Sequence, residues 1–199
     1  MPRPDPTDAA AHGVDTAGQH RHEVDRNPSA DAHVHVHTDQ VPRRRAVVIT
    51  VSDRSAAGLR EDLSGPAAVE ALTQAGWSVD APRVVPDGAE PVRLALEEAV
   101  AEGPDLVLTL GGTGVGPRDR TPEGTRAVLD LELPGVAEVI RARGLQKTPT
   151  AALSRAVAGT AGHSVVVNLP GSPAAVRESL EVLVPLVPHV LDQLRGGDH

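Results

Sequence analysis

The sequence predicts an α/β protein with a three-layer α/β/α architecture, in which helices cover both faces of a mostly parallel sheet. Apolar runs typical of buried strands alternate with helix-like segments over most of the chain, and this alternation implies right-handed crossovers between parallel strands. The composition agrees with a large core, because 40% of the 199 residues are apolar. Trp77 is the only aromatic residue, so this core must be built from Val, Leu, Ile and Ala.

The first half of the expected domain holds two strands and two helices. Residues 46–51 form an apolar run rich in β-branched side chains, which favours a strand covered on both faces. A helix should follow over residues 64–76, where a Ser-Gly-Pro sequence precedes it and a glycine ends it. We expect a second strand over residues 79–85 and a second helix over residues 91–103, where apolar residues recur at helical spacing.

A third strand and two helices are expected in the middle of the domain. Residues 105–110 are almost entirely apolar and predict a third buried strand. Thr121 is expected to be the N-cap of a helix, since a proline and a glutamate follow it in what would be the first turn. Residues 136–143 predict a further helix.

The end of the chain predicts a fourth strand and a long helix. Residues 163–169 resemble the other buried strands. Ser172 followed by a proline predicts another N-cap, and apolar residues at helical spacing then continue to residue 194. Pro185 and Pro188 should kink or break this last helix, because proline lacks the N–H that the helix needs.

Charge and residue usage exclude several classes of function. The net charge is −8 and Lys147 is the only lysine, so the chain lacks the basic patch and the aromatic platforms that nucleic-acid partners require. Without cysteine, there are no disulfides, thiolate metal sites or cysteine nucleophiles. No apolar stretch approaches 18 residues and residues 1–10 lack an apolar leader, so we expect a soluble cytoplasmic protein without a membrane partner.

Residues 1–42 differ from the rest and are expected to be a disordered, acidic, histidine-rich tail preceding the domain at residues 43–199. They hold seven acids and six of the nine histidines, with no periodic apolar face. His33, His35 and His37 alternate with valines, so in an extended chain they would share a face and could bind a divalent metal. The alternative that we favour is an inert polar extension.

The glycine-rich segment at residues 111–123 is the strongest functional signal. Four glycines in six residues follow a buried strand directly, and a helix start follows them. Glycine permits positive φ and a close approach of backbone N–H groups to a ligand, so this turn is suited to phosphate. Arg118 could add a charge-assisted contact and Asp119 could bind Mg²⁺. The alternative is a turn that only reverses the chain. The segment is neither a Walker A motif nor a dinucleotide-binding fingerprint.

Two other turns should meet the glycine-rich segment, because the loops at the carboxyl ends of parallel strands gather at one edge of the sheet. Ser52 and Asp53 end the first strand, and the alternative role for them is local backbone capping. Residues 168–173 end the fourth strand, where a structural role is equally plausible.

Asp87 follows the second strand in a Pro-Asp-Gly sequence, where a turn role is the alternative. If Asp87 and Asp119 meet across the site, they could share a Mg²⁺ ion and position a nucleotide triphosphate. Ser154 and the adjacent arginine could face the same opening, whereas His163 and the histidine at 189 are expected to be structural.

These motifs, in this order, resemble the MogA/MoaB family of molybdopterin-binding proteins from molybdenum cofactor biosynthesis. The resemblance extends from about residue 46 to residue 194. A single motif of this kind would be weak, but the ordered set is specific. The segments that carry it are Ser52-Asp53-Arg54 with Gly58, Pro86-Asp87, Gly111-Gly112-Thr113-Gly114, Arg118-Asp119 with Thr121-Pro122, Pro149-Thr150-Ala151, Leu153-Ser154-Arg155 and Asn168-Leu169-Pro170-Gly171-Ser172-Pro173.

The resemblance implies a trimeric protein of the MogA/MoaB-like fold that binds molybdopterin, a pterin with a dithiolene and a terminal phosphate. MogA-like members transfer AMP from ATP to this phosphate with Mg²⁺ and release pyrophosphate, and a molybdenum-insertion protein is an implied partner. Asp87 and Asp119 match the aspartates that the family ties to catalysis, and they are the expected Mg²⁺ ligands. The residues implied in substrate and phosphate binding are Ser52, Asp53, Gly111, Gly112, Thr113, Gly114, Arg118, Ser154, Pro170, Gly171 and Ser172.

Gly124 departs from the family pattern, because it stands where an alanine is usual; this change should loosen the start of its helix. Three alternative functions remain beside the adenylyltransferase. One is a MoaB-like protein that binds molybdopterin without adenylylating it, although the presence of both aspartates argues against this. The others are a nucleotide pyrophosphatase and an interaction scaffold, and the chain lacks the additional domains that either would need.

Overall fold

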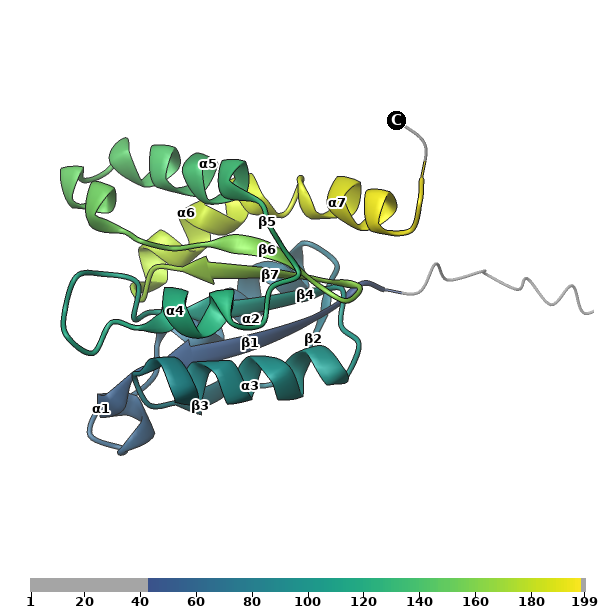
Figure 1. Ribbon diagram of the computed structural model, residues 1–199. Helices are drawn as coiled ribbons and strands as arrows, with labels where there is room; N and C mark the ends of the chain where they lie inside the picture. The colour runs from purple at the N-terminus through teal and green to yellow at the C-terminus, as the bar shows by residue number, and fades with distance from the viewer. Residues whose placement is uncertain (1–42, 198–199) are drawn as a thin grey trace, which may run out of the picture. The chain divides into compact units, whose positions relative to one another are not determined.

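The computed structural model describes residues 43–197 (Figure 1). The expectations for residues 1–42, including a metal site at His33, His35 and His37, lie outside the described residues. Between residues 43 and 197, no helix is both long enough and apolar enough to cross a membrane.

A seven-stranded sheet forms the centre of the described part of the chain. Its order is β2 (Ser78–Val79), β1 (Arg45–Val51), β4 (Leu106–Leu110), β7 (Ser164–Leu169), β6 (Ala158–Ala161) and β5 (Leu131–Glu132), and β3 (Arg83–Val85) also pairs with β1. The central strands β1 (Arg45–Val51), β4 (Leu106–Leu110) and β7 (Ser164–Leu169) run parallel to one another. Nearly all of their residues are buried, as expected for strands that helices cover on both faces. The prediction of a mostly parallel α/β fold is therefore confirmed.

The second predicted strand, over residues 79–85, is interrupted. Two short strands replace it: β2 (Ser78–Val79) pairs with the start of β1, and β3 (Arg83–Val85) pairs with its end. Pro82 lies between them, and it lacks the N–H that an unbroken ladder would need. The prediction of a single strand was therefore wrong, although both short strands run parallel to β1, as a mostly parallel sheet implies.

Two strands had no counterpart among the expected elements. β6 (Ala158–Ala161) pairs antiparallel with β7, and β5 (Leu131–Glu132) pairs antiparallel with β6. The turn from β6 to β7 passes through Gly162, whose φ is 56°, and a glycine adopts such a conformation without steric cost. His163 lies in this turn and not in a strand.

Four helices pack on one face of the sheet: α2 (Ser64–Gln74), α5 (Pro134–Leu145), α6 (Pro173–Leu183) and α7 (Val187–Leu194). Their apolar residues share one core cluster with side chains of β1, β4 and β7. This layer accounts for the larger part of the core, and it holds the strands in place from one side.

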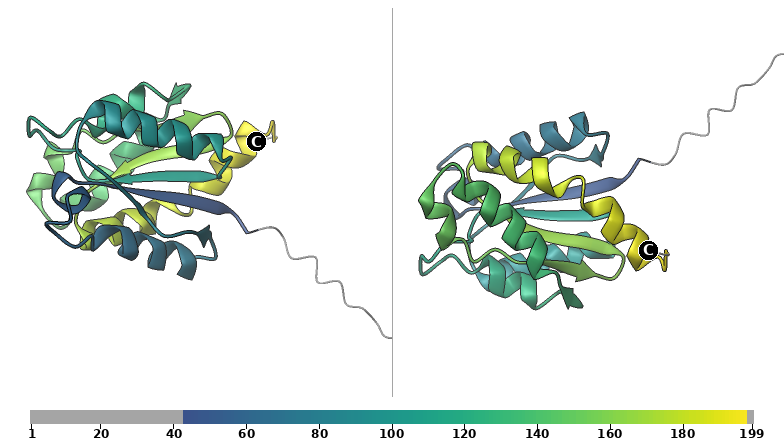
Figure 2. Two further views of the ribbon diagram at one scale, coloured as in Figure 1. Left: turned by 90° about the horizontal axis from the view of Figure 1, so that it is seen from below. Right: turned by 90° about the horizontal axis from the view of Figure 1, so that it is seen from above.

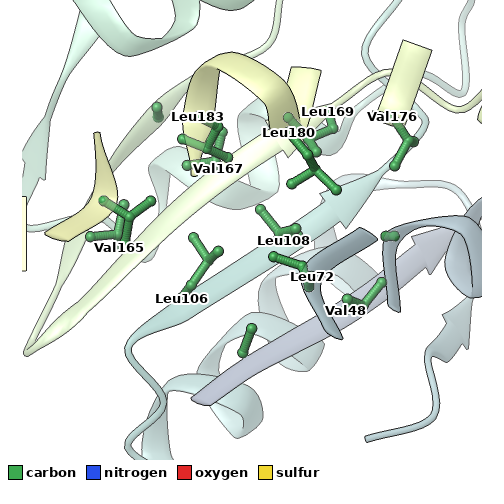
Figure 3. Packing of buried hydrophobic residues seen from close by; sticks show 14 of the residues in the cluster. Val48, Leu72, Leu106, Leu108, Val165, Val167, Leu169, Val176, Leu180 and Leu183 are labelled. Carbon is green, nitrogen blue, oxygen red and sulfur yellow. The ribbon is translucent and has the colours of Figure 1, made fainter. Parts of the chain in front are cut away.

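Close packing in this layer is visible in Figure 3. Leu72 of α2 lies near Val48 and Leu108 of the sheet, and Leu183 of α6 lies near Val167. Each of these five side chains is at most 3% exposed. The core thus consists of branched aliphatic side chains, as the near absence of aromatic residues predicts.

The opposite face of the sheet is covered by α3 (Ala89–Ala101) and α4 (Thr121–Arg126). Leu96 of α3 packs with Ile49 and Val107 in a second core cluster. Figure 2 shows α3 and α2 on opposite sides of the sheet, so the three-layer arrangement is the one predicted.

The long final helix is broken as predicted. It divides into α6 and α7, and Pro185 lies in the gap between Leu183 and Val187. Pro188 does not break a helix, because it lies in the first turn of α7, where the missing N–H has no partner to lose.

Candidate functional site

Three turns meet at the carboxyl ends of β1, β4 and β7, which are neighbours in the sheet. The Gly111 N–H donates to the carbonyl oxygen of Leu169 at 3.0 Å, which joins the turn after β4 to the end of β7. A Cβ at Gly111 would lie 2.7 Å from the carbonyl oxygen of Val51 and 3.8 Å from the Cα of Gly171. Only glycine fits this crossing, where φ is also 103°.

A cavity of about 210 Å³ opens on one side of this crossing. Ser52, Gly111, Gly112 and Gly171 line it, so the expected meeting of the three turns is found. The Ser52 hydroxyl also accepts a hydrogen bond from the N–H of Ser55 at 3.2 Å, because Ser52 caps the short helix α1 (Asp53–Ala56). The serine therefore combines a cavity position with the capping role that was its alternative.

A second cavity, of about 270 Å³, lies beyond the next residues of the glycine-rich segment. It is lined by five of the expected residues: Thr113, Gly114, Ser154, Pro170 and Ser172. The segment 111–114 thus forms a wall common to the two cavities, with its first half on one and its second half on the other.

This common wall offers unpaired donors. Among the described residues, the N–H groups of Gly112, Thr113 and Gly114 have no hydrogen-bond acceptor. Gly111 and Gly112 both have positive φ, 103° and 61°, which turns the chain sharply after β4. Successive free N–H groups in such a turn favour an anion, and phosphate oxygens are suitable acceptors.

Asp53, Asp87 and Arg118 form an interlocked group beside the wall. The Asp53 N–H donates to Asp87 Oδ2 at 2.7 Å, and the Asp87 N–H donates to Asp53 Oδ1 at 3.0 Å. Arg118 donates to both carboxylate oxygens of Asp53, at 2.9 and 3.1 Å, and to the carbonyl oxygen of Asp87 at 2.7 Å. The hydrogen bond from Arg118 lowers the pKa of Asp53 and outweighs the opposing effect of desolvation. Asp53 is thus paired with Arg118, whereas Nη1 of Arg118 makes no hydrogen bond to the described residues.

Asp119 lies beside the second half of the glycine-rich segment, next to Gly114 and Gly116. Its Oδ2 accepts a hydrogen bond from the N–H of Gly116 at 2.9 Å. Asp87 Oδ1, by contrast, lies 3.3 Å from the position of a Cβ at Gly112. The two aspartates thus flank the segment, and within residues 43–197 no hydrogen bond joins them.

Arg155 fixes the glycine-rich segment from the side of the second cavity. Its guanidinium donates to the carbonyl oxygen of Gly114 at 2.7 Å, to Glu123 Oε1 at 2.5 Å and to the carbonyl oxygen of Asp119. Its backbone N–H donates to the carbonyl oxygen of Thr113 at 2.8 Å. The hydrogen bond from Arg155 also lowers the pKa of Glu123. Arg155 is therefore a structural clamp for the segment rather than a free cation.

The N-cap predicted at Thr121 is wrong, whereas the one at Ser172 is confirmed. Ser172 Oγ accepts a hydrogen bond from the N–H of Ala175 at 3.3 Å. Thr121 is instead the first residue of α4, the cap position belongs to Arg120, and no side chain caps that helix. The Thr121 hydroxyl is fully buried, and it has no hydrogen-bond partner among the described residues.

Two charged residues that line the cavities, Asp62 and Lys147, were not among the expected site residues. Asp62 lines the first cavity, where its carboxylate accepts hydrogen bonds from Thr50 at 2.7 Å and from Ser64 and Gly65 at the start of α2. Its position two residues before a Ser-Gly-Pro helix start was the available signal. Lys147 lines the second cavity, just before the 3₁₀-helix η1 (Pro149–Leu153). The only signal for it in the sequence was that it is the single lysine of the chain.

Comparisons with known proteins agree with this geometry. Residues 47–189 match a family model described as "Probable molybdopterin binding domain". A "Molybdenum cofactor biosynthesis bifunctional protein" of Synechococcus elongatus is 42% identical over 154 residues, which are 77% of this chain and 48% of that protein. This chain therefore spans about half the length of that relative.

Two further proteins are matched over nearly their whole length. A "Molybdopterin adenylyltransferase" of Pyrococcus furiosus is 40% identical over 168 residues, covering 81% of this chain and 98% of that protein. The structure of the "Molybdopterin biosynthesis Mog protein" from Mycobacterium ulcerans is 50% identical with a TM-score of 0.71, and the match covers 76% of this chain and 99% of that one. Sequence and fold agree, and the chain belongs to the molybdopterin-binding domain family.

Proposed function

We propose that the protein is a molybdopterin adenylyltransferase, which transfers AMP from ATP to the phosphate of molybdopterin and releases pyrophosphate. The observation that carries this proposal is the common wall at residues 111–114, with three free N–H groups between two cavities. Two substrates whose phosphates must react need adjoining sites and donors where the sites meet. The relative of Pyrococcus furiosus named for this activity supports the proposal.

The reaction requires no covalent intermediate with the protein. The phosphate oxygen of molybdopterin attacks the α-phosphorus of ATP, and the bond to the leaving pyrophosphate breaks, so no side chain has to act as a nucleophile. The free N–H groups of Gly112, Thr113 and Gly114 would hold two anions that repel each other and would stabilise the charge that develops. The absence of cysteine is compatible with this mechanism.

Asp87 and Asp119 are suited to hold Mg²⁺ together with substrate phosphates. Each has one carboxylate oxygen engaged by a backbone N–H, and within the described part of the chain the other oxygen, Oδ1, accepts no hydrogen bond. Residues 43–197 contain no cluster of three or more His, Asp or Glu side chains that could hold a metal alone. Mg²⁺ is commonly bound by one or two carboxylates and the substrate phosphates, so this donor set fits it. When bound, the ion supplies positive charge that offsets the charge on the phosphates.

We further propose a homotrimer that works in the cytoplasm and passes its product to a molybdenum-insertion protein. Exposed apolar side chains on α5 and η1 support an assembly: Val139, Leu145 and Leu153 are 43, 49 and 55% exposed. Light scattering of the purified chain should give three times the mass of one chain. A monomer at micromolar concentration would contradict the trimer without affecting the proposed activity.

The decisive experiment is an assay of pyrophosphate release with ATP, Mg²⁺ and molybdopterin. We expect release that requires all three, together with the appearance of adenylylated molybdopterin by mass spectrometry. Binding of molybdopterin without pyrophosphate release would identify a binding-only protein instead. Pyrophosphate release from nucleotide alone would indicate a pyrophosphatase.

A further inference from the structure

We propose that Thr121 is a positioning residue, whose hydroxyl holds the free carboxylate oxygen of Asp87 during the reaction. The inference rests on the proposed function, because it concerns the same site. Thr121 has no exposed surface, and its Oγ1 has no hydrogen-bond partner among the described residues. Burying an unpaired hydroxyl destabilises a fold, so such a group calls for a partner that is engaged at another stage of the protein's work.

The Thr121 hydroxyl and the Asp87 carboxylate both lie next to Gly112. A Cβ built on Gly112 would collide with Thr121 Oγ1 and would lie 3.3 Å from Asp87 Oδ1. Both oxygens therefore face one point beside the common wall. Because Gly112 has no side chain, nothing of its own separates the hydroxyl from the carboxylate.

The Thr121 backbone is fixed, so its hydroxyl has a defined position. The Thr121 N–H donates to the carbonyl oxygen of Gly112 at 3.1 Å. The Thr121 carbonyl oxygen accepts a hydrogen bond from Thr125 Oγ1 at 2.9 Å, and that hydroxyl in turn accepts one from Asn168 Nδ2 at 2.8 Å. This buried network ties the start of α4 to the end of β7.

Asp87 is fixed in the complementary way. Its Oδ2 accepts the Asp53 N–H at 2.7 Å, so Oδ1 is the oxygen that remains available. Hydrogen bonds of catalytic groups commonly tighten when substrate binds, so we expect the Thr121 hydroxyl and Oδ1 to come within hydrogen-bond distance in the substrate complex. A carboxylate oxygen has two lone pairs, so Oδ1 can accept from Thr121 and still face the substrate phosphates.

Replacement of the hydroxyl by a methyl group tests this role. Thr121→Val keeps the size of the side chain and removes an unpaired polar group, so its melting temperature should equal or exceed that of the wild type. Its kcat for pyrophosphate release should nevertheless fall about 10- to 100-fold, the usual effect of losing a group that orients a ligand-holding residue, and KM for ATP with Mg²⁺ should rise, because a misplaced Asp87 also holds the ion less well. Thr121→Ser retains the hydroxyl and should recover most of the kcat.

Ser164→Ala is the matched control for loss of a buried hydroxyl. Ser164 Oγ donates to the carbonyl oxygen of Pro104 at 2.6 Å, at the start of β7 and away from both cavities, so this variant should melt several degrees lower and still keep its kcat well below the melting temperature. The proposal is wrong if Thr121→Val keeps full kcat. It is also wrong if Thr121→Ser loses as much activity as Thr121→Val, because the hydroxyl would then be irrelevant.

A second measurement separates this inference from the proposed function. The rise in melting temperature caused by ATP with Mg²⁺ can be recorded for the wild type and each variant without any turnover. A wild type that releases no pyrophosphate would contradict the adenylyltransferase alone. The role of Thr121 would then stand if Thr121→Val loses at least about half of this ligand-induced rise and Thr121→Ser retains it. An undiminished rise in Thr121→Val would overturn it.

Discussion

Asp119 has its two carboxylate oxygens in different environments. Oδ2 holds the N–H of Gly116 at 2.9 Å, whereas Oδ1 accepts no hydrogen bond from the described residues. One oxygen therefore shapes the glycine-rich segment, and the other can serve a metal ion or substrate. A substitution at this position has to distinguish these two roles.

Asp119→Asn and Asp119→Ala together make that distinction. The amide oxygen of asparagine can still accept from Gly116, but its neutral side chain is a poor Mg²⁺ ligand, so we expect a loss of about 100-fold or more in pyrophosphate release while molybdopterin binding survives. Asp119→Ala should lose at least as much activity and also loosen the segment. Calorimetric titration with molybdopterin and the pyrophosphate assay measure the two effects. Normal turnover by Asp119→Asn would refute the role given to this carboxylate.

Asp62 predicts an acid-sensitive contribution to stability. Burial alone would raise the pKa of this carboxyl group, but hydrogen bonds from Thr50, Gly65 and Ser64 outweigh it and lower the pKa below its ordinary value of 3.8. A group with a lowered pKa in the folded state stabilises the protein above the ordinary pKa, and this stabilisation is lost as the pH falls through the folded pKa.

The matching experiment is urea unfolding of Asp62→Asn and the wild type at several pH values. At pH 7 the substitution should lower the free energy of unfolding by about 1–2 kcal/mol, because it removes hydrogen bonds to a charged acceptor. As the pH falls below 3.8 and through the lowered pKa of the folded state, the difference should shrink, since the wild-type carboxylate then becomes protonated as well. A difference that does not change with pH would show that charge is not the cause.

At the scale of elements, Gly124 explains how closely α3 and α4 approach each other. A Cβ at Gly124 would collide with the carbonyl oxygen of Ala89 and would lie 3.0 Å from the Cβ of Val92. Gly124 therefore has a packing role beside the expected loosening of the start of α4. The glycine is required by packing between the two helices on this face of the sheet.

Gly124→Ala should consequently destabilise the protein by about 1–3 kcal/mol, despite the higher helix propensity of alanine. Gly135→Ala in α5 is the matched control, because a Cβ there would have no atom within 4 Å. That substitution should be neutral or stabilise by up to about 1 kcal/mol. Thermal unfolding of the two variants measures both effects, and equal melting temperatures would contradict the packing argument.

The whole molecule shows which parts of the fold the sequence could predict. Long apolar runs identified β1, β4 and β7, because strands covered on both faces need such runs. β6 escaped notice since three of the four residues in Ala158–Ala161 are alanine or glycine, which have little strand preference, and its pairing with β7 decides its conformation. Burial and pairing with distant segments are properties of the folded chain that a local pattern does not contain.

The same distinction applies to the site. The three turns could be predicted to meet, because parallel strands place their carboxyl ends at one edge. The division into two cavities, the clamp formed by Arg155 and the unpaired Thr121 hydroxyl depend on side-chain directions in the folded protein. The roles given to Asp87 and Asp119 stay predictions until the variants are measured.

Removal of residues 1–42 tests how the chain is organised. The family match begins at residue 47, and both cavities are formed by residues after 49. A chain beginning at Arg43 should therefore keep the melting temperature and the pyrophosphate release of the full chain within about twofold. Loss of activity with an unchanged melting temperature would instead assign the first 42 residues a part in the reaction.

Trp77 has a practical consequence for all of these measurements. It is 5% exposed and precedes β2, whose first residue pairs with the start of β1, so it lies at the end of the sheet away from the two cavities. As the only tryptophan in a chain without tyrosine, it is a single natural fluorophore. Its emission will report loss of the folded core from one known position, and a ligand in either cavity will not touch the emitting ring.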